Sequence, residues 1–134
     1  MKVLRLIMPA ACDIYNMRLI EDDSNSNKVK NEKYFACHCQ NEKKFLQMID
    51  DIKNILWKKC AKQFNPGNNY YYLTTSYASQ IKNLKVTYDV NVNKDNNKCN
   101  YFDSESTAKH VLQAIIDVFA RYGVDLPNKT NQIY

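Results

Sequence analysis

Residues 41–69 read NEKKFLQMIDDIKNILWKKCAKQFNPGNN, and this stretch decides the fold class. Its apolar residues recur every three or four positions, which is the spacing of one face of an α-helix. Asn41 is a favoured N-cap residue type, and Asn65-Pro66-Gly67-Asn68-Asn69 is a strong turn signal. We therefore expect a helix that begins after Asn41 and ends at this turn. Its apolar stripe consists of Phe45, Ile49, Ile52, Leu56 and Cys60.

A second helix is predicted from about residue 106 to 122, again from apolar residues at helical spacing. Ser104 or Ser106 can cap its start, and Gly123 can close it as the C′ residue. Its stripe consists of Val111, Ile115, Val118 and Tyr122.

Shorter apolar or alternating runs predict strands. The clearest is 84–92, where apolar and polar residues alternate as they do in a strand with one wet face. Two polar segments lack any periodicity, and we expect a mobile loop at about 21–33 and a polar tail from about 125. The other strands are expected at 3–8, 14–20, 34–39, 70–77 and 99–102.

Length and composition indicate one globular domain spanning residues 1–134. The chain has 134 residues, of which 45% are hydrophobic and 25% charged. It has 2 glycines and 3 prolines, which disfavours an all-β fold because tight turns consume these residues. We predict the α+β class: a single antiparallel sheet of about four to five strands with both amphipathic helices on one face, in the rough order β-β-α-β-β-β-α.

Charge and cysteine usage point to a cytoplasmic protein. The formal net charge is +5, and the excess is mostly lysine spread among acidic residues. The 5 cysteines are an odd number, which fits a reducing compartment better than a disulfide framework. Arg5 interrupts an N-terminal apolar run that is already short for a secretion signal, and no stretch has the length of a transmembrane helix.

The residues that could support chemistry are dispersed, so we predict no enzyme activity, no cofactor and no metal. Cys37-His38-Cys39 contains zinc-ligand types, but alternation on a strand sends His38 to the opposite side from the cysteines. His110 falls on the polar side of the second predicted helix. Two glycines are too few for a phosphate-binding loop.

The preferred function is a non-catalytic adaptor or assembly subunit that contacts a protein partner. The first predicted helix is apolar over more than one stripe, and Leu46, Trp57 and Phe64 extend one flank. Trp57 is the expected anchor, because tryptophan is enriched among residues that dominate binding energy. The oligomeric state stays open.

The alternative is an RNA-contacting subunit of a ribonucleoprotein. Tyrosines on a strand can stack on bases while lysines contact phosphates. The residues of this hypothesis are Lys44, Lys58, Lys62, Tyr70, Tyr72 and Lys85.

Two kinds of resemblance accompany these patterns. The run 64–73, FNPGNNYYYL, followed by LKVT at 84–87, resembles the last strands of the ephrin ectodomain, which implies an extracellular β-sandwich ligand as a minor alternative. The order of elements is similar in outline to longin-type domains, which bind partners, and from residue 41 onward to the RNA-binding modules of the signal recognition particle. These outlines imply binding without chemistry and rest on no motif residues.

Overall fold

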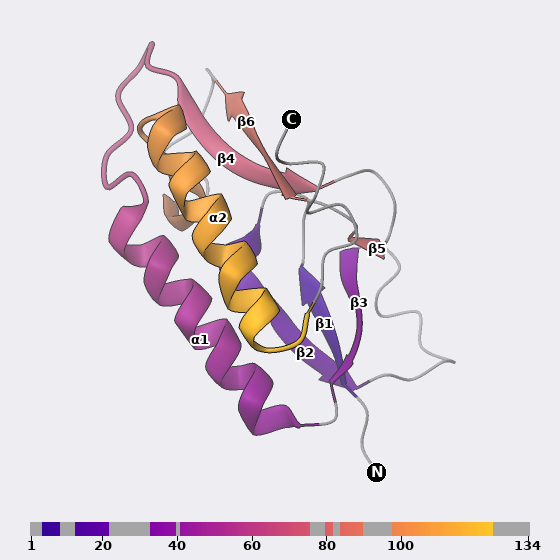
Figure 1. Cartoon of the computed structure of the whole chain (residues 1–134). Helices are drawn as coiled ribbons and strands as arrows, with labels where there is room; N and C mark the ends of the chain where they lie inside the picture. The colour runs from indigo at the N-terminus through magenta and orange to yellow at the C-terminus, as the bar shows by residue number, and fades with distance from the viewer. Residues whose placement is uncertain are drawn as a thin grey trace.

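The protein belongs to the α+β class, with two long helices packed against strands (Figure 1). The computed structural model describes residues 4–8, 13–21, 33–39, 41–75, 80–81, 84–89 and 98–124. The expected loop falls mostly outside the described residues, and the expected tail falls wholly outside them. The elements are β1 (Leu4–Met8), the 3-10 turn η1 (Ile14–Asn16), β2 (Arg18–Glu21), β3 (Lys33–Cys39), α1 (Glu42–Lys59), β4 (Tyr70–Thr75), β5 (Gln80–Ile81), β6 (Leu84–Asp89), the 3-10 turn η2 (Lys98–Asn100), β7 (Tyr101–Phe102) and α2 (Glu105–Arg121).

The described strands pair in two sheets, so the expectation of a single antiparallel sheet is not confirmed. One sheet has the order β2-β1-β3-β5, in which β1 pairs antiparallel with β2 and β3, and β5 runs parallel to β3. The other has the order β6-β4-β7 and is antiparallel. Alternation along one strand indicates which face is buried but carries no information about which distant strand lies beside it. The β-sandwich implied by the ephrin resemblance is absent from the described residues, where the helices form one of the two layers.

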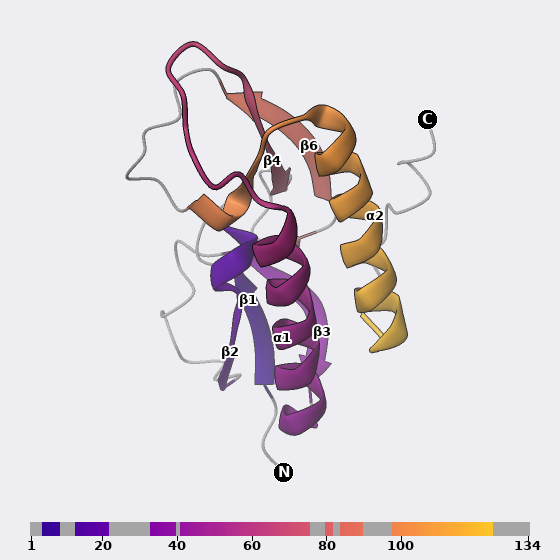
Figure 2. The ribbon, with the colours of Figure 1, turned by 90° about the vertical axis from the view of Figure 1, so that its left-hand side faces the viewer.

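The helices lie side by side, and each covers a different part of the strand layer. Figure 2 shows α1 lying across the first sheet with α2 beside it. Contacts join α1 to β2, whereas α2 contacts β4, β6 and β7 of the second sheet. The helix pair therefore connects the two sheets.

Both predicted N-caps form, and the sequence rules explain them. The backbone N–H of Lys44 donates to Oδ1 of Asn41 at 3.0 Å, and that of Thr107 donates to Oγ of Ser104 at 3.1 Å. At the end of α2, Gly123 has a φ of 83°, a conformation that L side chains rarely adopt. Ser104, and not Ser106, is the cap of α2.

The end of α1 differs from the prediction. The helix stops at Lys59, and Cys60 is extended, several residues before the turn at Pro66 and Gly67. The Ala61 N–H donates to the Tyr101 carbonyl oxygen at 2.7 Å. This long-range bond draws the chain out of the helix toward β7, which a local turn signal cannot predict.

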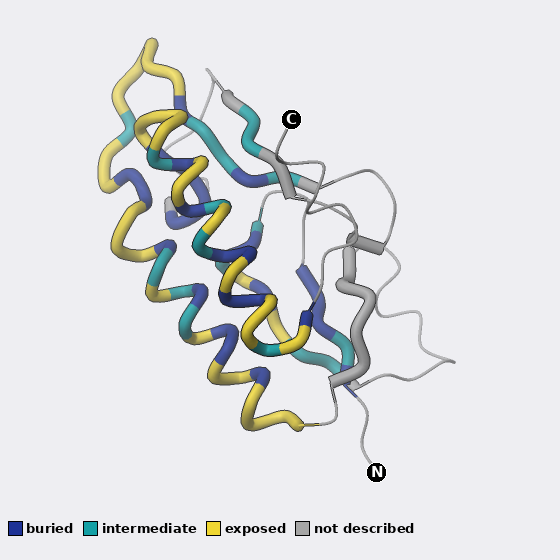
Figure 3. The backbone as a smooth tube through the Cα atoms, in the orientation of Figure 1, coloured by how far each residue is buried: buried dark blue, intermediate teal, exposed yellow. Residues whose placement is uncertain are grey.

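The core lies between the helix layer and the strands (Figure 3). The buried side of α1 and the buried side of α2 face inward, as the predicted stripes require. Their other sides are exposed along most of each helix in the same view. The largest side chains with under 2% exposure include Phe102, Phe119, Leu6, Ile7, Met8, Met48, Ile52 and Leu56.

Candidate functional site

One side of α1 exposes two large apolar side chains. Leu46 is 50% exposed and Trp57 is 58% exposed. They are eleven positions apart, so at about 100° per residue they point within about 20° of each other, three turns apart. We call the surface formed by Leu46, Asp50, Lys53 and Trp57 the α1 flank. Exposed apolar side chains mark interaction surfaces, and a tryptophan is often the energetic centre of a protein contact.

The α1 flank points away from α2. Asp51, which bonds to α2, is turned about 120–140° around α1 from Leu46 and Trp57. Among the described residues, no element covers either side chain, as their exposure shows. The flank is thus available to a second molecule approaching from outside the helix layer.

Two ammonium groups lie along the flank. Lys62 Nζ is 4.5 Å from the centroid of the Trp57 ring, and Lys53 Nζ is 5.6 Å from the centroid of the Tyr15 ring. Lys62 also donates a hydrogen bond to the Trp57 carbonyl oxygen. A cation over an aromatic face is attracted by the ring quadrupole and restricts the ring's motion. Trp57 is therefore exposed and held by Lys62 at the same time.

A shallow hollow adjoins Leu46 at the start of α1. Its volume is about 430 Å³, and it opens widely to solvent. It is lined by Glu42, Lys43, Leu46, Gln47 and Asp50. Such a hollow can receive one side chain of a partner next to the exposed leucine.

Phe64 does not extend the α1 flank, although the sequence placed it there. The helix ends at Lys59, so Phe64 is carried away from the helical stripe. Its ring packs edge-on against Tyr70 at 4.8 Å and against Tyr101 at 5.8 Å between centroids. Phe64 is half-buried and belongs to a small aromatic cluster with these tyrosines and Tyr72.

The residues of the nucleic-acid hypothesis do not gather on one surface. Lys44, Lys58 and Lys62 are exposed. Tyr70 is 3% exposed, and its hydroxyl oxygen accepts the Asn65 N–H at 2.6 Å. A buried ring cannot stack on a base. Tyr72 is half-buried with its ring 5.4 Å from that of Tyr101, and the side chain of Lys85 lies outside the described part of the structure.

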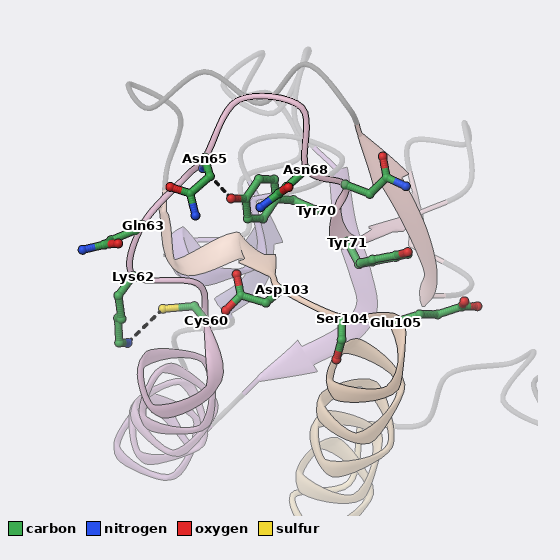
Figure 4. A pocket seen from close by; sticks show the side chains of 11 residues that line it. Cys60, Lys62, Gln63, Asn65, Asn68, Tyr70, Tyr71, Asp103, Ser104 and Glu105 are labelled. Carbon is green, nitrogen blue, oxygen red and sulfur yellow. Dashed lines mark hydrogen bonds between the residues drawn. The ribbon is translucent and has the colours of Figure 1, made fainter.

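A wider cleft of about 720 Å³ separates the end of α1 from the start of α2 (Figure 4). Lys62 lies on the α1 side, and Asp103 and Glu105 lie on the α2 side. Amide side chains from the turn after α1, with Tyr71 from β4, complete the lining. The cleft can hold a polar ligand by hydrogen bonds, because amides both donate and accept.

A group of thiols and neighbouring polar atoms lies at the α1 end of this cleft. Cys60 lines the cleft, and its sulfur is 3.2 Å from Lys62 Nζ and 3.6 Å from the Trp57 carbonyl oxygen. The pKa of Cys99 is raised to about 11, first by burial and then by the adjacent Cys60. The pKa of Tyr15 is also raised, first by burial and then by Cys99 and Cys60. We call Tyr15, Cys60, Lys62 and Cys99 the thiol cluster.

The thiol cluster has no signal in the sequence. Cys60 and Cys99 are separated by 39 positions, and the surrounding residues form no metal or redox motif. The N–H of Tyr15 donates to Oδ1 of buried Asn100 at 2.9 Å, and Asn100 Nδ2 donates to Asp13 at the same distance. These bonds hold η1 against η2, so contacts between distant segments assemble the cluster.

The other residues that the sequence suggested for chemistry are the cysteines and histidine of β3 and His110 of α2. Cys37, His38 and Cys39 are consecutive in β3, and the directions of their side chains lie outside what the structure describes. His110 is exposed on α2. Within the described ranges, no three His, Cys, Asp or Glu side chains are placed to share a metal ion, and no helix is long and apolar enough to cross a membrane.

Comparison with known proteins adds no relative. No protein-family model matches the chain, and no curated protein or solved structure matches it either.

Proposed function

We propose that the protein is a non-catalytic binding module, a small adaptor or assembly subunit that contacts a protein partner through the α1 flank. The observation that carries the proposal is the pair Leu46 and Trp57, exposed on the same side of one rigid helix. A helix face fixes both side chains before binding, so little conformational entropy is lost on contact. Trp57 is the expected anchor and Leu46 the second contact.

The charges of the flank define the partner's chemistry. Lys53 and Lys62 place ammonium groups beside the apolar contact at the Trp57 end. We expect the partner to present an apolar side chain or groove with carboxylates at its edge, because opposite charges at the rim increase the rate of association and fix its orientation.

The proposal assigns no reaction to the molecule. The α1 flank consists of apolar and charged groups suited to contact, whereas catalysis requires acid, base or nucleophilic groups directed at a common substrate. The compartment we propose is the cytoplasm, which is consistent with neither Cys60 nor Cys99 being in a disulfide.

The RNA alternative receives less support, because Tyr70 is buried and Tyr72 is half-buried. It also predicts a different response to salt. Phosphate contacts weaken steeply between about 50 and 200 mM salt, whereas an apolar contact persists.

Affinity capture from native extract, with and without nuclease, tests the proposal. We expect wild-type protein to retain a protein partner at about 200 mM salt after nuclease treatment. Trp57→Ala and Leu46→Ala should lose it. Lys109→Ala is the matched control, because this exposed α2 residue lies on the other helix and its salt bridge to Glu105 is on the surface. Circular dichroism of each variant verifies the fold.

Loss of binding on nuclease treatment would overturn the proposal in favour of RNA. Equal capture by wild type and Trp57→Ala would exclude the α1 flank as the binding surface.

A further inference from the structure

Cys60 and Cys99 are brought together at the point where α1 ends and β7 begins. Cys60 is the C-cap of α1, and Cys99 lies in η2, two residues before Tyr101. The Ala61 N–H to Tyr101 carbonyl bond of 2.7 Å holds the two segments side by side. Both thiols are buried, neither is in a disulfide, and Cys60 lies close enough to Cys99 to raise its pKa. The pair is therefore built by the fold and not by a local motif.

Cys60 and Cys99 are buried to the same degree, at 6% and 7% exposure, and they differ in what surrounds their sulfurs. Cys60 lines the open cleft, and the ammonium of Lys62 is 3.2 Å from its sulfur (Figure 4). Cys99 is not among the residues that line the cleft. Burial and then the adjacent Cys60 raise the pKa of Cys99 to about 11, so this thiol is protonated at neutral pH. A thiol on the wall of an open cleft and close to a cation, with a second thiol beside it, is the arrangement that thiol–disulfide exchange requires.

We propose that Cys60 and Cys99 form a redox-active dithiol, in which Cys60 reacts with a low-molecular-weight disulfide from the cleft and Cys99 resolves the product. In the first step the Cys60 thiolate attacks one sulfur of the small disulfide, the S–S bond breaks, and one small thiolate leaves. In the second step the Cys99 thiolate attacks Cys60, the mixed disulfide breaks, and the second small thiolate leaves. The protein dithiol is oxidised by two electrons, the small disulfide is reduced to two thiols, and the two cysteine protons pass to the leaving thiolates.

Lys62 has a definite part in the first step. Its ammonium lies where the negative charge of the attacking sulfur is concentrated. The same ammonium contacts the Trp57 ring and carbonyl oxygen. Oxidation of Cys60 turns the thiol that this ammonium contacts into a disulfide, so the reaction should also change the surroundings of Trp57. The inference does not depend on the proposed protein-binding function, although it would place that surface under redox control.

Peptide mapping tests the proposal directly. The folded protein is incubated with oxidised glutathione, free thiols are blocked by alkylation, and the chain is cleaved after lysine and arginine. Cys60 and Cys99 then fall in the peptides 60–62 and 99–109, whereas Cys12 falls in 6–18 and Cys37 and Cys39 share 34–43. We expect a peptide in which 60–62 is joined to 99–109. Alkylated 60–62 and 99–109 with no joined product would overturn the proposal.

Variants separate the two steps. Cys99→Ser should accumulate glutathione on Cys60, because the resolving thiol is absent. Cys60→Ser should leave Cys99 alkylated and free of glutathione. The opposite pattern, with glutathione on Cys99 and none on Cys60, would contradict the assigned order. Should either variant fail to fold, the joined peptide of the wild type still decides the proposal.

The contribution of Lys62 is measured by rate. Lys62→Met should slow glutathione uptake by Cys60 severalfold, and Lys59→Met is the matched control, because Lys59 is an exposed lysine at the end of α1. Trp57 is the single tryptophan of the chain, so its fluorescence follows the reaction. We expect a fluorescence change in step with formation of the joined peptide, and none in Cys60→Ser. Equal rates in Lys62→Met and wild type would exclude the role of Lys62.

Discussion

The phenol of Tyr122, which caps α2, donates a hydrogen bond of 2.7 Å to Oδ2 of Asp51 in the middle of α1. The other carboxylate oxygen of Asp51 accepts from Nε2 of Gln47 at 2.9 Å. The bond from Tyr122 and then the bond from Gln47 lower the pKa of Asp51 below its usual value of 3.8. This pair therefore joins the two helices through a charged acceptor.

The Asp51 bond predicts an acid-dependent contribution to stability. A carboxyl group whose pKa is lower in the folded state stabilises the fold above its unfolded pKa, and this stabilisation is lost as the pH falls through the folded value. We expect Tyr122→Phe to unfold at a slightly lower temperature than wild type at pH 7, and the difference to shrink as the pH falls below 3.8. Thermal unfolding followed by circular dichroism at several pH values measures this. A difference that grows on acidification would contradict the assignment.

The thiol cluster predicts a loss of stability in alkali. The folded pKa of Cys99 is raised from 9.0 to about 11, so the protonated thiol is favoured by the fold. The protonated thiol therefore contributes fully to the free energy of unfolding below pH 9, and this contribution is lost as the pH rises toward 11. We expect the unfolding temperature of the wild type to fall between these pH values under reducing conditions. Cys99→Ala should show a smaller decrease over the same interval, and an equal decrease would exclude Cys99 as a source.

The buried side of α2 predicts that truncating one of its side chains, Phe119, lowers the free energy of unfolding strongly. Phe119 has 0% exposure and faces the strands from α2. Phe119→Ala removes a buried ring and leaves a cavity, which should lower the free energy of unfolding by about 3–5 kcal/mol. Gln113→Ala on the exposed side of α2 should change it by under about 0.5 kcal/mol. Denaturant titration of both variants compares the values, and similar results for the two would contradict the placement of the core.

The N-cap of α2 predicts that replacing Ser104 lowers the stability of the fold moderately. Ser104 Oγ accepts from the Thr107 N–H at 3.1 Å and also contacts the Thr107 hydroxyl at 2.9 Å. Ser104→Ala should cost about 1 kcal/mol of stability, and Ser104→Asp should retain most of it. Ser106→Ala is the control, because it does not cap the helix. Equal losses in Ser104→Ala and Ser106→Ala would show that the cap is misplaced.

The sequence predicts the helices well because their signals are local. The apolar spacing, Asn41, Ser104 and Gly123 each act within a few residues, and the structure confirms all of them. The end of α1 was predicted too late, because the bond between Ala61 and Tyr101 joins residues 40 positions apart.

The sequence also predicts the binding surface only in part, because part of it depends on contacts between distant segments. Leu46 and Trp57 share a helix, so their common direction follows from helical geometry. Helical spacing would place Phe64 on the same flank only if the helix continued past Lys59. In the structure the helix ends there, and the Phe64 ring packs against Tyr70 and Tyr101. The pairing of strands in two sheets and the meeting of Cys60 with Cys99 depend on contacts between distant segments, which periodicity does not contain.

The central proposal is that the α1 flank binds a protein. Its most direct test is the dissociation constant of the captured partner, measured by titration calorimetry for wild type, Trp57→Ala and Lys109→Ala. We predict that Trp57→Ala weakens binding by about thirtyfold or more, as the loss of an anchor residue does, while Lys109→Ala binds as the wild type does. Equal dissociation constants for wild type and a folded Trp57→Ala would contradict the proposal.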